Sequence, residues 1–190
     1  MRRHTIVPLT LAAVLALGAC SGGGSGKAAT TTPPTAVQLS SSTWEVAKPT
    51  PSTSAQMVCQ KEAREEIASS LGVTETRVTA PTWDVADHLY SCTYVYPRGT
   101  ITLSVKEMSN EAETTAYFDG IEQKYGTTQP LDGLGQGAEI LQNSDVVVRK
   151  DYKVLLVDVQ DIPANFIPLM GRSDVATNIA AVIMGCWSGQ

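Results

Sequence analysis

The chain has 190 residues, with 14 lysines and arginines against 19 aspartates and glutamates, and a formal net charge of −5. This length leaves room for one ordinary domain. The acidic balance disfavours nucleic acid and anionic lipid headgroups as partners, because both reward clusters of Lys and Arg.

The first residues are typical of an export signal. Arg2 and Arg3 precede an apolar run over Ile6–Leu17, interrupted only by Pro8 and Thr10. A membrane-spanning helix needs about 20 apolar residues, so the run is too short for a permanent span and fits the apolar core of a signal peptide. No later stretch is long and apolar enough to span a membrane, so we expect a mature protein without a transmembrane helix.

The apolar run ends in Leu17-Gly18-Ala19-Cys20. These residues resemble the bacterial lipobox, in which small side chains suit a narrow peptidase pocket and the cysteine thiol accepts diacylglycerol. An ordinary secretory cleavage site near a cysteine is the alternative, but the Ser/Gly-rich stretch from Ser21 favours a lipid tether. We expect residues 1–19 to be removed as a signal peptide and Cys20 to be lipidated. The loss of Arg2 and Arg3 leaves 12 basic against 19 acidic residues, a formal charge of −7.

Residues 20–53 are predicted to be the lipidated cysteine and a disordered linker. Their composition is mostly Ser, Gly, Ala, Thr and Pro, with Trp44 and Val46 as isolated exceptions. Such a segment buries too little apolar surface to offset its chain entropy. The folded domain is therefore predicted over residues 54–190.

The first half of that domain predicts a helix and a β-hairpin. The helix ends at Gly72, and Leu89–Tyr96 forms a strand with its tyrosines and Cys92 on one side. After a turn at 97–99, apolar and polar residues alternate through 100–106, which indicates a half-buried strand. The inward residues of the helix are Cys59, Ala63, Ile67 and Leu71, and those of the second strand are Ile101, Leu103 and Val105.

The second half predicts a helix, a hairpin and a final helix. The first helix starts after Ser109 or Asn110 and ends at Gly126. Strands follow over 145–149 and 152–159, and the last helix starts at Ser173. The inward residues of the first helix are Ala116, Tyr117, Ile121 and Tyr125, and those of the last are Val175, Ile179, Val182, Ile183 and Cys186. This order predicts an α+β fold, with an antiparallel sheet of hairpins packed against two or three helices in two layers.

Four features carry a resemblance to a known family: Cys59 just inside the first predicted helix, Ser70-Leu71-Gly72-Val73, the sequence SCTY at Ser91–Tyr94, and LDGLGQGA at Leu131–Ala138. Over about residues 57–160 the chain resembles small actinobacterial lipoproteins of a domain family of unknown function, which are related to secreted sensor-type domains. The resemblance implies export, lipidation, a disulfide between the two early cysteines and no established enzymatic activity.

The cysteines left after lipidation are Cys59, Cys92 and Cys186. An oxidising compartment favours one disulfide and leaves one thiol over. The residue pattern also favours Cys59 with Cys92, because the first lies on a helix stripe and the second on the strand face that this helix would cover. Cys186 is interpreted as a buried, inert thiol, with a reactive or intermolecular cysteine as the alternative.

The segment Gly133–Ala138 formally fits a dinucleotide-binding fingerprint. That fingerprint needs a strand before it and a helix after it, whereas Gln129-Pro130 precedes this one and a strand-like region follows. We therefore interpret the glycines as a tight turn and predict no cofactor.

The mature chain has one histidine, His88, which follows Asp84 and Asp87. A metal site or a hydrolase centre built on these residues is conceivable, but a solvated loop is the favoured interpretation. Asp158 and Asp161 are an unconvincing acid/base pair, because strand alternation sends them to opposite faces. No catalytic residue and no metal ligand is predicted. The aromatic residues that could line an apolar pocket are interpreted as core; they are Trp83, Tyr90, Tyr94, Tyr96, Tyr117 and Tyr125.

Together these observations predict a lipid-anchored module on the outer face of the cell membrane that acts by binding in the cell envelope. Its partners would be the membrane, through lipid on Cys20, and an unknown envelope protein or small ligand, but no nucleic acid. Two alternatives remain open: a carrier with an apolar cavity between sheet and helices, and an envelope hydrolase that uses His88. The sequence leaves the ligand and the oligomeric state open.

Overall fold

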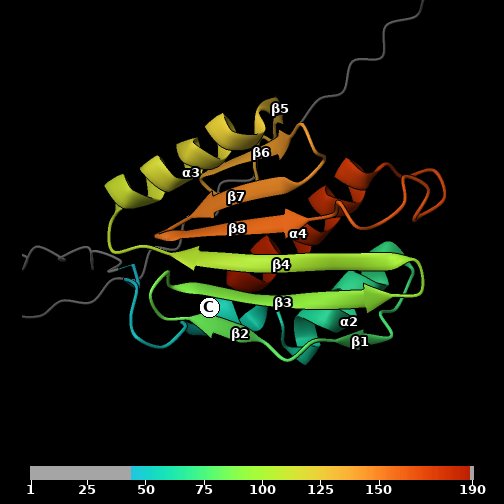
Figure 1. Cartoon of the computed structure of the whole chain (residues 1–190), viewed down its shortest axis with the longest axis horizontal. Coiled ribbons are helices and arrows are strands. Elements are labelled where there is room, and N and C mark those ends of the chain that lie inside the picture. The colour runs from blue at the N-terminus through green and yellow to red at the C-terminus, as the bar shows by residue number, and fades with distance from the viewer. Residues whose placement is uncertain (1–43, 189–190) are drawn as a thin grey trace, which may run out of the picture. The chain divides into compact units, whose positions relative to one another are not determined.

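The computed structural model describes residues 44–188 (Figure 1). The predicted signal peptide, the predicted lipidation site at Cys20 and most of the predicted linker lie outside these residues. The helices are α1 (Thr53–Met57), α2 (Lys61–Leu71), α3 (Glu111–Tyr125) and α4 (Arg172–Ser188). The strands are β1 (Arg77–Val78), β2 (Thr82–Asp84), β3 (Leu89–Tyr96), β4 (Gly99–Glu107), β5 (Thr127–Pro130), β6 (Gly137–Leu141), β7 (Val146–Lys150) and β8 (Lys153–Asp158).

The strands form one antiparallel sheet in the order β1-β3-β4-β8-β7-β6-β5, and β2 also pairs with β3. Strand alternation sends side chains to two faces, which we call the helix face and the open face. On the helix face, Leu103 of β4 pairs with Val157 of β8, which in turn pairs with Val146 of β7. This register aligns the apolar residues of the central strands in one continuous layer.

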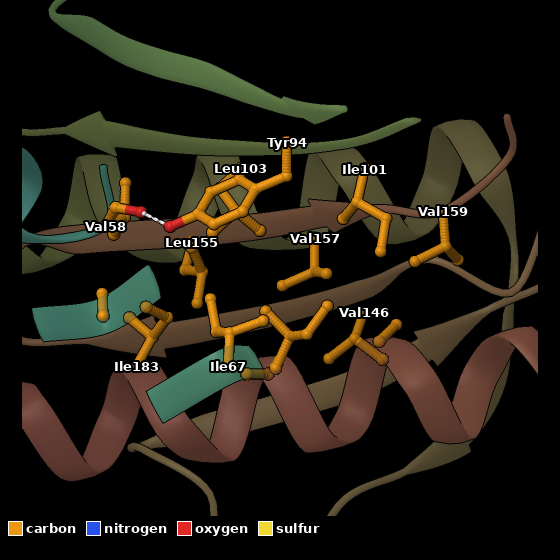
Figure 2. Close-up of a cluster of buried hydrophobic side chains, with 14 of the residues drawn as sticks. Val58, Ile67, Tyr94, Ile101, Leu103, Val146, Leu155, Val157, Val159 and Ile183 are labelled. Carbon is orange, nitrogen blue, oxygen red and sulfur yellow. Dashed lines mark hydrogen bonds between the residues drawn. The ribbon is translucent and has the colours of Figure 1, made fainter. Parts of the chain in front are cut away.

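The main core lies between the helix face and the helices α1, α2 and α4 (Figure 2). Ile67 of α2 and Ile183 of α4 are almost fully buried against this layer. Tyr94 of β3 is 1 % exposed, and its hydroxyl donates a hydrogen bond of 2.6 Å to the Val58 carbonyl. The strand tyrosines are therefore core residues, as the alternation of β3 predicted.

A smaller core lies on the opposite side of the sheet. There α3 places Phe118 and Ile121 against Leu141, Val147 and Val154 of β6, β7 and β8. Among residues 44–188, α3 is the helix that packs on this side, and it reaches only that half of the sheet (Figure 1). The predicted α+β arrangement of antiparallel hairpins and helices is confirmed, with α3 added on the second face.

Two predicted helix boundaries, at Gly72 and Asn110, agree with the structure. Gly72 follows α2 with φ 66°, a left-handed conformation that glycine adopts without steric cost, and its N–H donates to the Ala68 carbonyl. At the start of α3, Asn110 accepts a hydrogen bond from the Glu113 N–H at 2.9 Å. Glycine and a capping side chain therefore set these boundaries locally.

The inward side of α3 was predicted wrongly in part. Its buried residues are Thr114, Phe118 and Ile121, whereas Ala116 is exposed and Tyr117 is half-buried. The hydrophobic pattern of this helix is weak, because apolar residues occupy more than one side. The helix is oriented so that Phe118 is buried, which leaves Ala116 facing solvent and Tyr117 at the edge of the smaller core.

The folded part also begins earlier than the predicted boundary at residue 54. Residues 44–52, which we call the N-terminal strap, pack on the domain. Trp44 makes an edge-on contact with Tyr152 at 5.2 Å between ring centroids, and Trp83 donates to the Pro49 carbonyl at 2.8 Å. The composition of this stretch resembles a linker, but two tryptophans fasten it.

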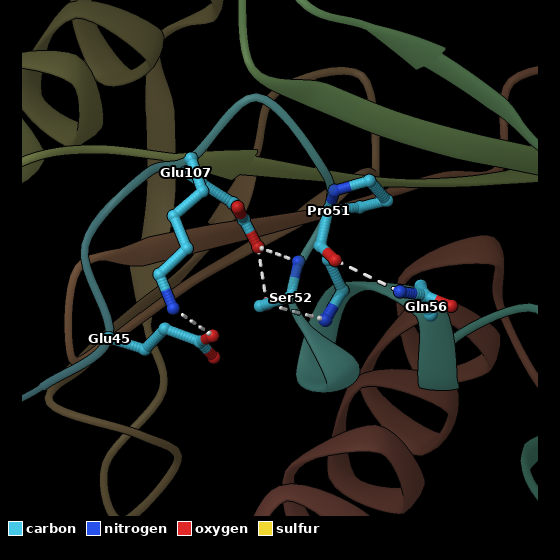
Figure 3. A network of polar contacts seen from close by, with 7 residues as sticks. Glu45, Pro51, Ser52, Gln56 and Glu107 are labelled. Carbon is cyan, nitrogen blue, oxygen red and sulfur yellow. Dashed lines mark hydrogen bonds and ion pairs between the residues drawn. The ribbon is translucent and has the colours of Figure 1, made fainter.

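The end of the strap is held by a buried carboxylate (Figure 3). Glu107 is 3 % exposed, and one of its oxygens accepts hydrogen bonds from the backbone N–H and the hydroxyl of Ser52. The same Ser52 hydroxyl oxygen caps α1 by accepting from the Ala55 N–H at 3.2 Å. The strap, α1 and β4 are therefore joined in one polar network.

The disulfide joins Cys59 to Cys92, with the Cα atoms 6.1 Å apart. Cys59 lies in the turn just before α2, and not on the helix itself as predicted, whereas Cys92 lies on the helix face of β3 as predicted. The pairing favoured by the sequence is therefore confirmed. Cys186 is free and half-buried on α4, so it lies at the margin of the buried stripe and not at its centre.

Replacing Cys59 and Cys92 by alanine should lower the free energy of unfolding by about 2–5 kcal/mol, because the bond closes a long loop in the unfolded chain. Cys186→Ala, the control, should change it by about 1 kcal/mol or less. Guanidinium denaturation measures both, and non-reducing peptide mapping should find Cys186 alkylated. A double variant as stable as the parent would show that the bond adds nothing to stability.

Candidate functional site

The half of the open face formed by β3 and β4 is rich in hydroxyl groups. Ser91 pairs with Ser104, and Thr93 pairs with Thr102, so four hydroxyls lie in two adjacent rows across these strands. Thr82 of β2 extends the first row, with its hydroxyl 2.9 Å from that of Ser91. The apolar residues between them point to the helix face, so the alternation that builds the core also builds this polar surface.

A groove runs between the open face and α3, and we call it the α3 groove. Its first part, of about 420 Å³, lies between the end of β4, at Lys106 and the following Met108, and the start of α3. Its second part, of about 300 Å³, lies between Leu156 of β8 and the end of α3. Ala116 and Tyr117 line both parts, so the two parts adjoin one another at the middle of the helix.

A glycine opens the second part of the groove. Gly120 is exposed, and a Cβ atom added there would meet no atom within 4 Å. Glycine in the interior of a helix costs about 0.5–1 kcal/mol relative to alanine. The absence of a side chain at Gly120 leaves space along the wall of the groove, although glycine destabilises the helix at this position.

Two lysines lie over tyrosines along the groove. The Lys106 ammonium is 5.6 Å from the centre of the Tyr117 ring, and the Lys124 ammonium is 4.7 Å from that of Tyr125. Lys106 also donates to the Asp87 carbonyl. Burial raises the pKa of Tyr117 above its ordinary value, with smaller contributions from Tyr125 and Asp87, so its hydroxyl is a hydrogen-bond donor at neutral pH.

His88 lies at one end of the α3 groove, in the turn between β2 and β3. Its ring is 5.9 Å from that of Trp83, and its φ of 47° places it in the left-handed region. Asp84 accepts hydrogen bonds from two backbone N–H groups of the turn, and Asp87 lies 3.9 Å from Lys106. Both carboxylates therefore have other partners than the histidine.

Within residues 44–188, no three His, Cys, Asp or Glu side chains are grouped so that they could hold a metal ion. In the same residues, no helix is long and apolar enough to cross a membrane.

The glycine-rich segment forms the turn between β5 and β6. A Cβ atom at Gly135, whose φ is 63°, would lie 2.5 Å from the Arg149 carbonyl oxygen. The strand β6 begins at Gly137, so the segment leads into a strand and not into a helix. The interpretation as a tight turn is confirmed by this geometry.

The two carboxylates at the end of β8 have separate partners. Asp158 accepts from the Gln160 N–H at 3.0 Å, and Asp161 accepts from the Thr100 hydroxyl at 3.3 Å. Burial raises the pKa of the Cys186 thiol, which lowers its thiolate fraction at neutral pH. None of these three groups adjoins the α3 groove.

Among the described carboxyl groups, Asp145 has the largest shift in pKa. It is 2 % exposed and accepts hydrogen bonds from the Val159 N–H, the Asn143 amide and the Gln160 amide. Burial raises its pKa to about 6, although these hydrogen bonds oppose the shift. It fastens the β6–β7 turn to the chain after β8 and lies away from the groove.

Sequence reasoning missed both the open face and the groove. The alternation at 100–106 predicted a polar side for β4 but did not indicate that this side remains uncovered. Glycine inside the helix 111–125 was the available signal for the groove. Comparisons with protein-family models, with curated proteins and with solved structures found no match to this chain.

Asp145→Asn should remove a pH-dependent part of the stability. In the folded state the pKa of Asp145 is about 6, above the value of about 4 expected when unfolded, so its protonation stabilises the fold. This contribution is complete below about pH 4 and is lost as the pH rises through about 6, up to roughly 3 kcal/mol.

The free energy of unfolding of the wild type minus that of Asp145→Asn should therefore fall between about pH 4 and 7. Urea denaturation at a series of pH values measures this difference. A difference that stays constant, or rises with pH, contradicts the assignment.

Proposed function

We propose that the protein is a lipid-anchored binding module of the cell envelope, held to the outer face of the membrane by lipid on Cys20. The export signal and the lipobox-like Leu17-Gly18-Ala19-Cys20 support the anchor. The α3 groove beside the open face is the single observation that carries the binding role. Ligand sites are concave and combine apolar surface with a few polar groups, as Leu156, Tyr117 and Lys106 do here.

The two alternative functions, a carrier of an apolar ligand and a hydrolase that uses His88, are not supported by a comparable observation. A carrier would need room between the sheet and the helices, where Tyr94, Leu155 and Ile183 are packed at 1 % exposure or less. A hydrolase would need His88 to be oriented by a carboxylate, and the two acids of its own turn, Asp84 and Asp87, are engaged elsewhere. Binding without catalysis is therefore the function that we propose.

Photo-crosslinking in intact cells tests the binding role. A photoreactive side chain at Ala116, which lines both parts of the groove, should give crosslinked products. Ala181 of α4 is the matched control, because it is also an exposed alanine inside a helix. Equal yields of crosslinked product at the two positions would refute the groove as the binding site.

Cys20→Ala should abolish acylation and release the protein from the membrane fraction, while the domain stays folded, because Cys20 precedes the folded part by more than 20 residues. Mass spectrometry of the mature N-terminus and membrane fractionation measure this. Lipid still attached to the variant would end the lipoprotein assignment.

A further inference from the structure

The chemistry of the open face indicates a class of ligand. The hydroxyls of Thr93 and Thr102 lie 3.0 Å apart, and those of Thr82 and Ser91 lie 2.9 Å apart. A hydroxyl group has one donor and two acceptor sites, and each of these pairs uses only part of that capacity. The surface can therefore both donate to and accept from a ligand, which suits a ligand that itself carries many hydroxyls.

The first row of side chains becomes apolar as it approaches the groove. Ser91 pairs with Ser104, and Ser104 pairs with Leu156 at the foot of α3, where Tyr117 forms the wall. A sugar ring has the same division, with apolar C–H faces and a rim of hydroxyls. Aromatic and aliphatic side chains can pack against the C–H faces, and serine and threonine can form hydrogen bonds with the hydroxyl rim.

Charge favours a neutral ligand over an acidic one. Two lysines line the groove: Lys106 is engaged by Asp87 and by the ring of Tyr117, and Lys124 lies over the ring of Tyr125. Asp158 extends the row of Thr93 and Thr102 on the same face, so the open face also carries a carboxylate. The mature chain has a formal charge of −7, with 12 basic and 19 acidic residues, which repels polyanions at long range.

The shape favours a chain over a compact molecule. The two parts of the groove, of about 420 and 300 Å³, follow one another along α3, and the hydroxyl rows continue the floor across β4 and β3. We propose that the open face and the α3 groove bind an uncharged polysaccharide strand. This inference rests on the proposed binding function and names the ligand class of the same site.

Isothermal titration of the mature chain, residues 20–190 with Cys20→Ser, tests the inference. The probes are hexamers and dimers of β-1,4-linked N-acetylglucosamine and of β-1,4-linked glucose, with heparin as the polyanion. At least one neutral hexamer should bind about tenfold or more tightly than its dimer, because it occupies both parts of the groove. Heparin should bind more weakly than that hexamer.

Gly120→Trp should weaken hexamer binding by about tenfold or more by filling the groove. Gly185→Trp is the matched control, because Gly185 is also an exposed helical glycine whose added Cβ would meet no atom within 4 Å. Thr93→Val with Thr102→Val should weaken binding while keeping the shape of the strands. Circular dichroism and thermal melts establish that each variant is folded.

The inference is overturned if no neutral hexamer binds, if heparin binds best, or if Gly120→Trp and Gly185→Trp bind the hexamer equally. If the photoreactive group at Ala116 captures a protein while no neutral hexamer binds, the glycan assignment is wrong and the binding function stands. If crosslinking yields at Ala116 and Ala181 are equal, the proposed function itself fails.

Discussion

The attachment of the α1–α2 corner to strand β3 is the constraint on which the rest of the domain depends. Residues 58 and 59 are held there by two different bonds: the Tyr94 hydroxyl donates to the Val58 carbonyl at 2.6 Å, and Cys59 is linked to Cys92. Tyr94 and Cys92 are neighbours on the same side of β3. The corner therefore directs α2 onto the helix face, where α4 packs beside it.

The two faces of the sheet are covered unequally. On the helix face the helices bury an apolar layer that runs across the central strands. On the opposite face α3 covers the β6–β8 half only, because Phe118 and Ile121 pack against Leu141 and Val147. The hydroxyl rows of β3 and β4 and the α3 groove are what this unequal covering leaves accessible. The candidate site is thus a consequence of where the core was placed.

Local chemistry explains which parts of the fold could be predicted from the sequence. Gly72 and Asn110 mark helix boundaries through their own backbone or side chain, so these positions needed no tertiary information. Strict alternation through Leu89–Tyr96 indicated the strand and the side on which Cys92 lies. The disulfide could be predicted because Cys92 lies on a strictly alternating strand and Cys59 lies directly before the helix that covers that strand.

The features that were missed depend on tertiary contacts. The strands β1 and β2 have two and three residues, too few for a period to be recognised, and they exist through pairing with β3. The N-terminal strap is ordered by contacts of Trp44 and Trp83 with residues distant in the sequence. The open face could not be predicted either, because the alternation of residues indicates that one side of β4 is polar but not whether a helix covers that side.

Labelling of Ser104→Cys with a membrane-impermeant maleimide, in a Cys186→Ala background, tests the central claim that the open face is a binding surface. Ser104 lies where the hydroxyl row meets the groove, and Ala181→Cys on α4 serves as the reference. In purified protein both cysteines should react. In intact cells position 104 should be protected relative to position 181 because its ligand covers it, and the same ratio of labelling in both settings would contradict the account.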